Sequence, residues 1–171
     1  MRAADDDQHA FVLTPALVML REFWALNHAI ERTSRRMATR IGVTVPQRMM
    51  LRVIGRVPGI GPGALAQLLH LDAGTVSATL RQLTARRLVT RRPHADDARR
   101  IELHLTARGS TLDAADEQTL EGALTRVLAK VDPRDQAAVR RFLAVFADEL
   151  DRIAPPGRPA RAGSPGRTTA R

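Results

Sequence analysis

The chain of 171 residues contains no cysteine. This absence excludes disulfides, thiol redox sensing, thiolate metal ligands and a cysteine nucleophile. Aromatic residues are scarce, at 3%, with one tryptophan and no tyrosine. The longest apolar run, residues 11–20, is interrupted by Thr14 and Pro15 and is shorter than the roughly 20 residues that a membrane span needs. Asp5 to Asp7 stand where a signal peptide would be positive, so we expect a soluble, cytoplasmic protein.

Lysine is nearly absent as well, because 26 of the 27 basic residues are arginine. Only 18 acidic residues oppose them, which gives a formal net charge of +9. The charge is unevenly distributed: residues 81–108 carry a net +5, residues 110–151 a net −4, and residues 154–171 add four arginines without an acid. This segregation favours a polyanionic partner, with nucleic acid ahead of an anionic membrane surface or an acidic substrate.

Helix signals dominate the first third of the chain. Thr14 precedes a proline, which is a typical helix start because the hydroxyl caps the helix and proline costs nothing at the first position. The apolar stripe that follows predicts a long helix to about residue 41. Thr44 and Gln47 have the spacing of a capping box and predict a second helix. The stretch 57–63 is rich in glycine and proline and predicts a turn without helix.

The central segment changes from a helical pattern to a strand pattern. Residues 64–89 show two short helices with a tight break, and Asp72 is placed to cap the second one. The apolar period then becomes two, which predicts a half-buried strand over 100–105. Its antiparallel partner is 88–92, and the charged loop 93–99 joins the two strands.

Further helices are predicted after the hairpin. Thr106 starts one whose apolar stripe continues to Val131, and Asp132 with Pro133 caps a last helix to Ile153. Long terminal helices around a small central unit rarely bury all their apolar stripes within one subunit. We therefore expect a homodimer.

The order of helix, turn, helix and hairpin with a charged tip is that of a winged helix-turn-helix, whose second helix enters the DNA major groove. The predicted fold class is mainly α with a small β wing, flanked by long helices that form a dimerisation domain. The predicted parts are a flexible N-terminus (1–12), a helical dimerisation region (13–41 and 107–153), a winged helix-turn-helix DNA-binding domain (42–106) and a disordered basic tail (154–171).

The segment LLHLDAGTVSATLRQLTARRLVTRR, followed by DDARRIELHLTARG, resembles the MarR family of winged-helix transcription regulators. The resemblance extends over residues 14–153. It implies a homodimer that binds a pseudopalindromic operator on double-stranded DNA. It also implies a repressor that a small aromatic or anionic effector releases.

The resemblance also assigns DNA contacts. Asp97 and Arg99 match the family's D-x-R motif in the wing, where the arginine enters the minor groove and the aspartate holds it in place. Thr75, Ser77 and Arg81 take exposed positions of the recognition helix, although helix capping is an equal alternative for Thr75. The complete predicted set of DNA-binding residues is Thr75, Ser77, Arg81, Arg86, Arg91, Asp97, Arg99 and Arg100.

Two positions depart from the family pattern. Arg87 stands where the family usually has glycine between the recognition helix and the wing. Either this residue adopts a positive φ, at a cost of about 1 kcal/mol, or the chain leaves the helix differently. Ala78 stands where relatives often carry a larger side chain, which would shift specificity toward the wing and DNA shape.

An effector pocket is predicted from two pairs of residues. Trp24 and His28 lie four residues apart on one helix, and Arg48 and Arg52 lie four apart on the next. If these faces meet, an aromatic wall with cationic groups would bind an aromatic acid. The alternative is that Trp24 belongs to the core and the other three are surface residues.

Catalysis is not predicted. The five histidines have no metal-ligand spacing, and neither a glycine-rich phosphate loop nor a nucleophile-elbow serine is present. We therefore expect no enzyme, catalytic residue, metal or cofactor. The alternative function from another class is a winged helix that serves as a protein-interaction module, without sequence-specific DNA binding, and meets an acidic partner.

Overall fold

The computed structural model describes residues 13–97, 99–114 and 118–153, so the predicted flexible N-terminus and basic tail lie outside the described residues. The described chain is mainly helical with one two-stranded antiparallel sheet, as predicted. None of the described helices is long and apolar enough to cross a membrane. The elements are α1 (Pro15–Arg40), α2 (Val45–Arg56), α3 (Pro62–Leu69), α4 (Ala73–Ala85), β1 (Val89–Pro93), β2 (Ile101–Leu105), α5 (Ala107–Asp113), α6 (Leu120–Leu128) and α7 (Pro133–Ile153).

Contacts divide the chain into two compact units, Met1–Leu124 and Thr125–Arg171. The first unit contains α1 to α5 with the hairpin and the start of α6, and the second contains the rest of α6 and α7. The predicted dimerisation region is thus distributed over both units, and its role in dimerisation stays a prediction.

Helix starts in the first unit follow the predicted capping residues. The Thr14 hydroxyl accepts a hydrogen bond from the N–H of Leu17 at 3.4 Å. Thr44 and Gln47 form the predicted capping box, in which each side chain accepts from the other's backbone N–H, at 3.4 and 3.1 Å. The prediction of no helix over 57–63 is wrong at its end, because α3 begins at Pro62, where proline is tolerated in a first turn.

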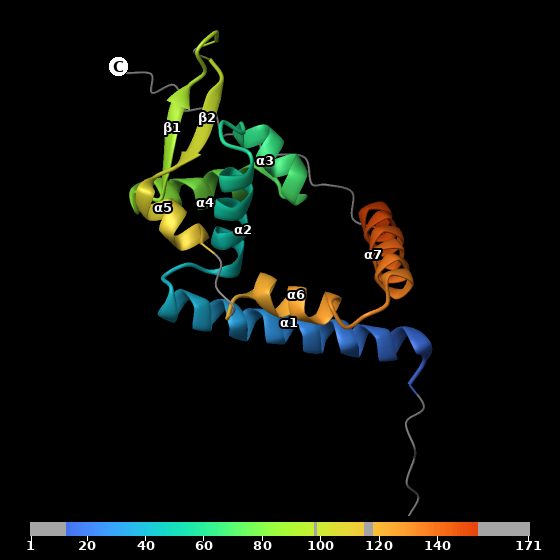
Figure 1. Cartoon of the computed structure of the whole chain (residues 1–171). Helices are drawn as coiled ribbons and strands as arrows, with labels where there is room; N and C mark the ends of the chain where they lie inside the picture. The colour runs from blue at the N-terminus through green and yellow to red at the C-terminus, as the bar shows by residue number, and fades with distance from the viewer. Residues whose placement is uncertain (1–12, 98, 115–117, 154–171) are drawn as a thin grey trace, which may run out of the picture. The chain divides into compact units, whose positions relative to one another are not determined.

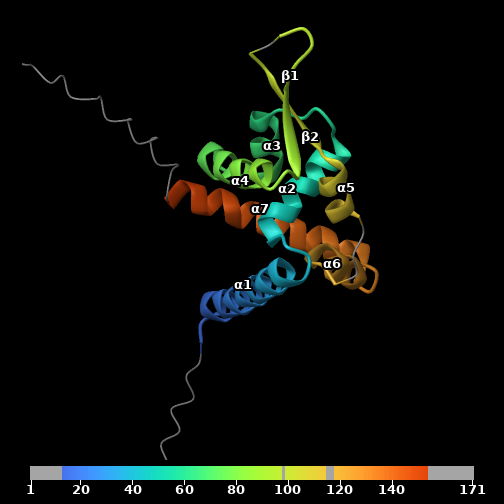
Figure 2. The same ribbon diagram turned by 90° about the vertical axis from the view of Figure 1, so that its left-hand side faces the viewer.

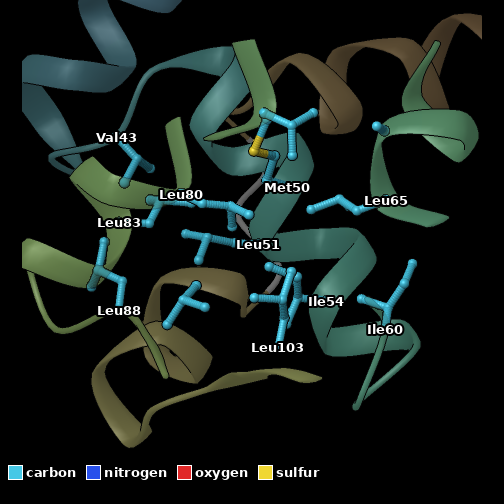
Figure 3. Packing of buried hydrophobic residues seen from close by; sticks show 13 residues of the cluster. Val43, Met50, Leu51, Ile54, Ile60, Leu65, Leu80, Leu83, Leu88 and Leu103 are labelled. Atoms are coloured by element: carbon cyan, nitrogen blue, oxygen red, sulfur yellow. The ribbon is translucent and has the colours of Figure 1, made fainter. Parts of the chain in front are cut away.

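The core of the first unit forms around α2. Met50, Leu51 and Ile54 on this helix are fully buried. Figure 3 shows them among side chains that come from α3, α4 and the hairpin. The buried residues that surround them include Val43, Ile60, Leu65, Val76, Leu80, Leu83, Leu88, Val89 and Leu103.

The hairpin continues directly from the recognition helix α4. β1 and β2 pair with the register Val89 to Leu105 and Pro93 to Ile101, close to the predicted strands. Leu103 of β2 also forms an antiparallel bridge with Ile60 from the turn before α3. The foot of the hairpin is therefore fixed to the helices, while its tip extends beyond them (Figures 1 and 2).

Arg87, the first departure from the family pattern, adopts a positive φ, which was one of the two alternatives. Its φ is +56°, so the left-handed conformation that usually requires glycine is present without one. The N–H of Leu88 donates to the carbonyl of Leu83 at 2.9 Å, and the N–H of Arg87 donates to that of Thr84 at 2.9 Å. This pair of bonds is a Schellman motif, which ends α4 and turns the chain into β1.

Thr106 and Gly109, which end the segment DDARRIELHLTARG, fix the start of α5. Thr106 accepts from the N–H of Gly109 at 2.9 Å and donates through its hydroxyl to the Arg87 carbonyl at 2.7 Å. A Cβ on Gly109 would lie 2.1 Å from the Leu88 carbonyl oxygen. α5 can therefore pack on the end of the recognition helix only because residue 109 has no side chain.

The prediction of one continuous helix from Thr106 to Val131 is wrong. α5 ends at Asp113, and α6 begins at Leu120. The carbonyls of Leu112 and Asp113, at the end of α5, accept hydrogen bonds from Arg48 and Arg52 of α2. These tertiary partners satisfy groups that a continuing helix would otherwise use.

Within the second unit, α7 follows the predicted cap. The side-chain amide of Gln136 donates to the carbonyls of Leu128 and Val131 at 2.8 and 2.9 Å, and thus closes the turn between α6 and α7. Phe142 and Phe146 stack with ring centroids 6.1 Å apart. Large apolar side chains of α7 remain exposed within this chain: Val139, Phe142, Leu143, Val145, Leu150 and Ile153.

We predict that Gly109→Ala destabilises the protein by about 3 kcal/mol, at the upper end of the cost of overpacking, because the new methyl group meets backbone atoms that cannot rotate away. Urea unfolding measures the effect. Gly63→Ala is the control, because a Cβ there would meet nothing within 4 Å. Equal stability of the two variants would contradict the close packing of α5.

We predict that Arg87→Gly stabilises the protein by about 1 kcal/mol, because glycine adopts the left-handed conformation without steric cost. Arg87→Ala is the matched control, since it removes the same charge but keeps a Cβ. A gain in unfolding free energy that is the same in both variants would attribute the effect to charge and exclude backbone strain as its cause.

Candidate nucleic-acid interface

The recognition helix α4 has one buried side and one exposed side. Val76 and Leu80 are buried, as predicted. Ser77 and Arg81 are exposed, also as predicted, and neither side chain makes a hydrogen bond or ion pair within the described part of the chain. Both polar groups are therefore available to an external partner.

Thr75, at the start of α4, binds the capping residue Asp72. Its N–H donates to Asp72 Oδ1 at 2.8 Å and its hydroxyl donates to Asp72 Oδ2 at 2.6 Å. The hydrogen bond from the Thr75 hydroxyl, followed by the one from its backbone N–H, lowers the pKa of Asp72. The capping alternative for Thr75 is thus present, and a contact with DNA stays a prediction.

The wing tip is organised by Asp97. Its Oδ1 accepts from the backbone N–H of Arg99 at 3.0 Å, and its carbonyl accepts from the N–H of Arg100 at 2.9 Å. The N–H of His94 in turn donates to the carbonyl of Arg100 at 2.9 Å. Asp97 therefore holds Arg99 through the backbone, which leaves the exposed guanidinium of Arg99 directed by the turn and not by an ion pair with Asp97.

Arg86 takes a structural position at the end of α4. Its guanidinium donates to the carbonyl of Gly42 and, at 3.3 Å, to Oε1 of Gln47. The amide of Gln47 also donates to Gln82 Oε1 at 2.9 Å. These bonds fasten the end of the recognition helix to the start of α2. The DNA contact predicted for Arg86 would have to be made by the part of the guanidinium that these bonds leave open.

The hairpin carries arginines on both faces. Arg91 is opposite Leu103 in the register, and Arg92 is opposite Glu102; both arginines are exposed. Glu102 lies near two imidazoles, 3.1 Å from Nε2 of His104 and 3.7 Å from Nε2 of His94. The predicted set of site residues contains neither histidine nor Glu102, although the period of two in this strand is a signal that places Glu102 and His104 on one face.

The four residues of the predicted effector pocket lie in two different settings. Trp24 is 69% exposed, contrary to the alternative that placed it in the core, and His28 is exposed beside Glu31, with its Nδ1 3.7 Å from the carboxylate. Arg48 is 2% exposed and Arg52 is half-buried, and both bind groups around the ends of α5 and α6. No hydrogen bond or ion pair joins the two pairs among the described residues.

A recognition helix with an exposed polar side, preceded by a supporting helix and followed by an arginine-bearing hairpin, defines a winged helix-turn-helix domain. Residues 41–100 match the model of the MarR family. The resemblance inferred from the sequence is thereby confirmed over these residues.

The chain is also similar to known proteins in sequence and in fold. The HTH-type transcriptional repressor Rv2887 of Mycobacterium tuberculosis is 29% identical over 103 residues, which are 60% of this chain and 74% of that protein. The fold is also similar to MepR of S. aureus in a DNA complex (TM-score 0.64, 20% identity, 76% of this chain and 96% of MepR). PcaV of Streptomyces coelicolor, solved with its natural ligand, has a TM-score of 0.62 at 23% identity and covers 86% of this chain and 98% of PcaV.

We predict that acid removes the stabilising effect of the Asp72 cap. Because the pKa of Asp72 is lowered in the folded protein, the carboxylate contributes stability above its ordinary pKa and loses this contribution as the pH falls through the lowered value. The wild type should therefore lose stability relative to Asp72→Asn between about pH 7 and about pH 3. Urea midpoints of both proteins test this, and a pH-independent difference would contradict it.

Proposed function

We propose that this protein is a sequence-specific DNA-binding transcriptional regulator that acts as a homodimeric repressor. The observation that carries the proposal is the exposed side of α4, where the side chains of Ser77 and Arg81 bind no other described residue while the opposite side fills the core. The family match of residues 41–100 and the DNA complex of the structurally similar MepR support it.

Each exposed group has a chemistry suited to DNA. A guanidinium such as that of Arg81 can bind O6 and N7 of guanine together, and a hydroxyl such as that of Ser77 can bind a phosphate or a base edge. Arg99 at the wing tip suits a narrow minor groove, because this groove concentrates negative potential. Arg91 and Arg100, which are also exposed, are proposed to contact phosphates and to position the domain.

Unpartnered apolar side chains support the homodimer. Trp24 and Leu26 of α1 are more than half exposed, as are several apolar residues of α7. Monomeric proteins rarely leave helices with so much apolar surface in water. A second copy with twofold symmetry would cover them and would place two recognition helices on a pseudopalindromic operator.

The proposal that the protein represses transcription and is released by an effector is based on similar proteins. Rv2887 is named a repressor, and PcaV is solved with a ligand. Trp24 and His28 are exposed in the single chain, so a small aromatic effector that binds them would lie at the edge of the proposed dimer interface. An anionic effector at Arg48 or Arg52 would have to replace the carboxylate of Glu121, which both arginines approach.

Fluorescence anisotropy of labelled DNA tests the proposed function. The probes are DNA from upstream of the protein's own gene, a scrambled duplex, and, if these bind alike, a duplex selected from random sequence. We expect one sequence to be preferred, saturation at two chains per site, and affinity that falls steeply with salt. Affinity for all duplexes without preference, or for none, would favour the protein-interaction module instead.

We predict that Arg99→Ala weakens binding to the preferred duplex by about tenfold or more, because a groove contact of this kind contributes on the order of 1–3 kcal/mol. The same titration measures the loss. Arg32→Ala removes an equal charge from the exposed surface of α1 and should change the affinity much less.

Two Asp97 variants distinguish the hydrogen bond that Asp97 accepts in the turn from its negative charge. Asp97→Asn retains an oxygen that can accept from the N–H of Arg99, so it should keep most of the affinity, whereas Asp97→Ala should lose it as Arg99→Ala does. Unchanged affinity in both alanine variants would refute the assignment of the wing tip to DNA.

A further inference from the structure

Two arginines of α2 reach the same junction between helices. Arg48 Nε lies 2.5 Å from Glu121 Oε1, and Arg52 Nε lies 3.8 Å from the same oxygen. Arg48 also donates to the carbonyls of Leu112 and Ala114, the latter at 3.3 Å. The end of α5 and the start of α6 are thus both bound to one side of α2.

A second contact strengthens this junction. Arg52 Nη1 donates to the carbonyl of Asp113 at 2.7 Å and lies 3.2 Å from its carboxylate Oδ1. The two arginines therefore meet two carboxylates, and they also bind the terminal carbonyls of α5, at the helix end that attracts cations. Arg40 of α1 donates to the carbonyl of Gln118, just before α6. We call Arg48, Arg52, Asp113 and Glu121 the α2–α6 joint.

The burial of Arg48 restricts the geometry of its ion pair with Glu121. Its side chain is 3% exposed, whereas that of Glu121 is 29% exposed. A charge as deeply buried as Arg48 has to be paired, and a guanidinium binds its partners in a fixed plane. Glu121 is in the first turn of α6, so the place where this helix starts is fixed with respect to α2.

We propose that Glu121 is a positioning residue for DNA binding. The proposal rests on the proposed function: in a homodimer, the joint connects the helix-turn-helix, through α2, to α6, which continues into the second unit. Held by Arg48 and Arg52, Glu121 sets the separation of the two recognition helices and hence the half-site spacing that the dimer accepts.

The test compares operators that differ only in spacing. The duplex that the wild type prefers is made with its half-sites at the original separation and one or two base pairs closer or farther apart. For the wild type we expect one preferred spacing. For Glu121→Gln we expect about tenfold weaker binding at that spacing, within the range of coupling between distant sites, and little discrimination among the spacings.

A second variant covers the case in which Glu121→Gln does not fold. In Arg48→Met with Glu121→Leu, apolar side chains replace the buried ion pair, which is often neutral for stability. The carbonyls of Leu112 and Ala114 lose their Arg48 donor in this variant, but Arg52 still binds the carbonyl of Asp113. This double variant should fold, dimerise and show the same loss of spacing preference. Glu149→Gln is the matched control, because it breaks the exposed pair of Glu149 with Arg152 on α7.

The readouts separate the two proposals. If the wild type prefers no DNA sequence, the proposed function is overturned and the joint's role falls with it. If the wild type shows a preferred sequence and spacing but a folded Glu121 variant keeps both unchanged, only the positioning role is overturned. Circular dichroism and sedimentation confirm folding and dimerisation before either comparison, so a stability effect is not mistaken for positioning.

Discussion

The first unit depends on the packing of α2, a helix of 12 residues that makes contacts on both its apolar side and its polar side. Its apolar side, with Met50, Leu51 and Ile54, holds the recognition helix and the foot of the hairpin in the core. Its polar side carries Arg48 and Arg52, which bind the ends of α5 and α6. A rotation of this one helix would therefore disturb the exposed side of α4 and the exit toward α6 together.

Features that depend on neighbours in the sequence could be predicted. The capping box of Thr44 with Gln47 and the Asp72 cap join residues three positions apart, and each forms as expected. The alternation over 101–105 likewise identified the strand: Leu103 is buried and Leu105 packs against the core, whereas Ile101, at the end of the strand nearer the tip, is exposed. Even the positive φ of Arg87 was one of two alternatives that its position left open.

Features that depend on distant partners could not be predicted. The apolar stripe from Thr106 to Val131 gave no sign that arginines about 60 residues earlier would bind the carbonyls of α5 and divide the helix. The structural role of Arg86 could not be predicted for the same reason. Its position at a helix end is typical of a solvated or DNA-facing residue, but its partner Gly42 lies 44 positions away. Arginine allows several roles, and only the tertiary fold chooses among them.

The hairpin's outer edge has a consequence for how the protein behaves in concentrated solution. β2 is paired on both sides, with β1 and with Ile60, so β1 is the open edge of the sheet in the described chain. An open edge is a template to which strands of other molecules can add. Pro93, which has no N–H to offer, and the charged Arg91 and Arg92 occupy most of this edge. The strand that extends toward a partner is thus also the one protected against edge-to-edge aggregation.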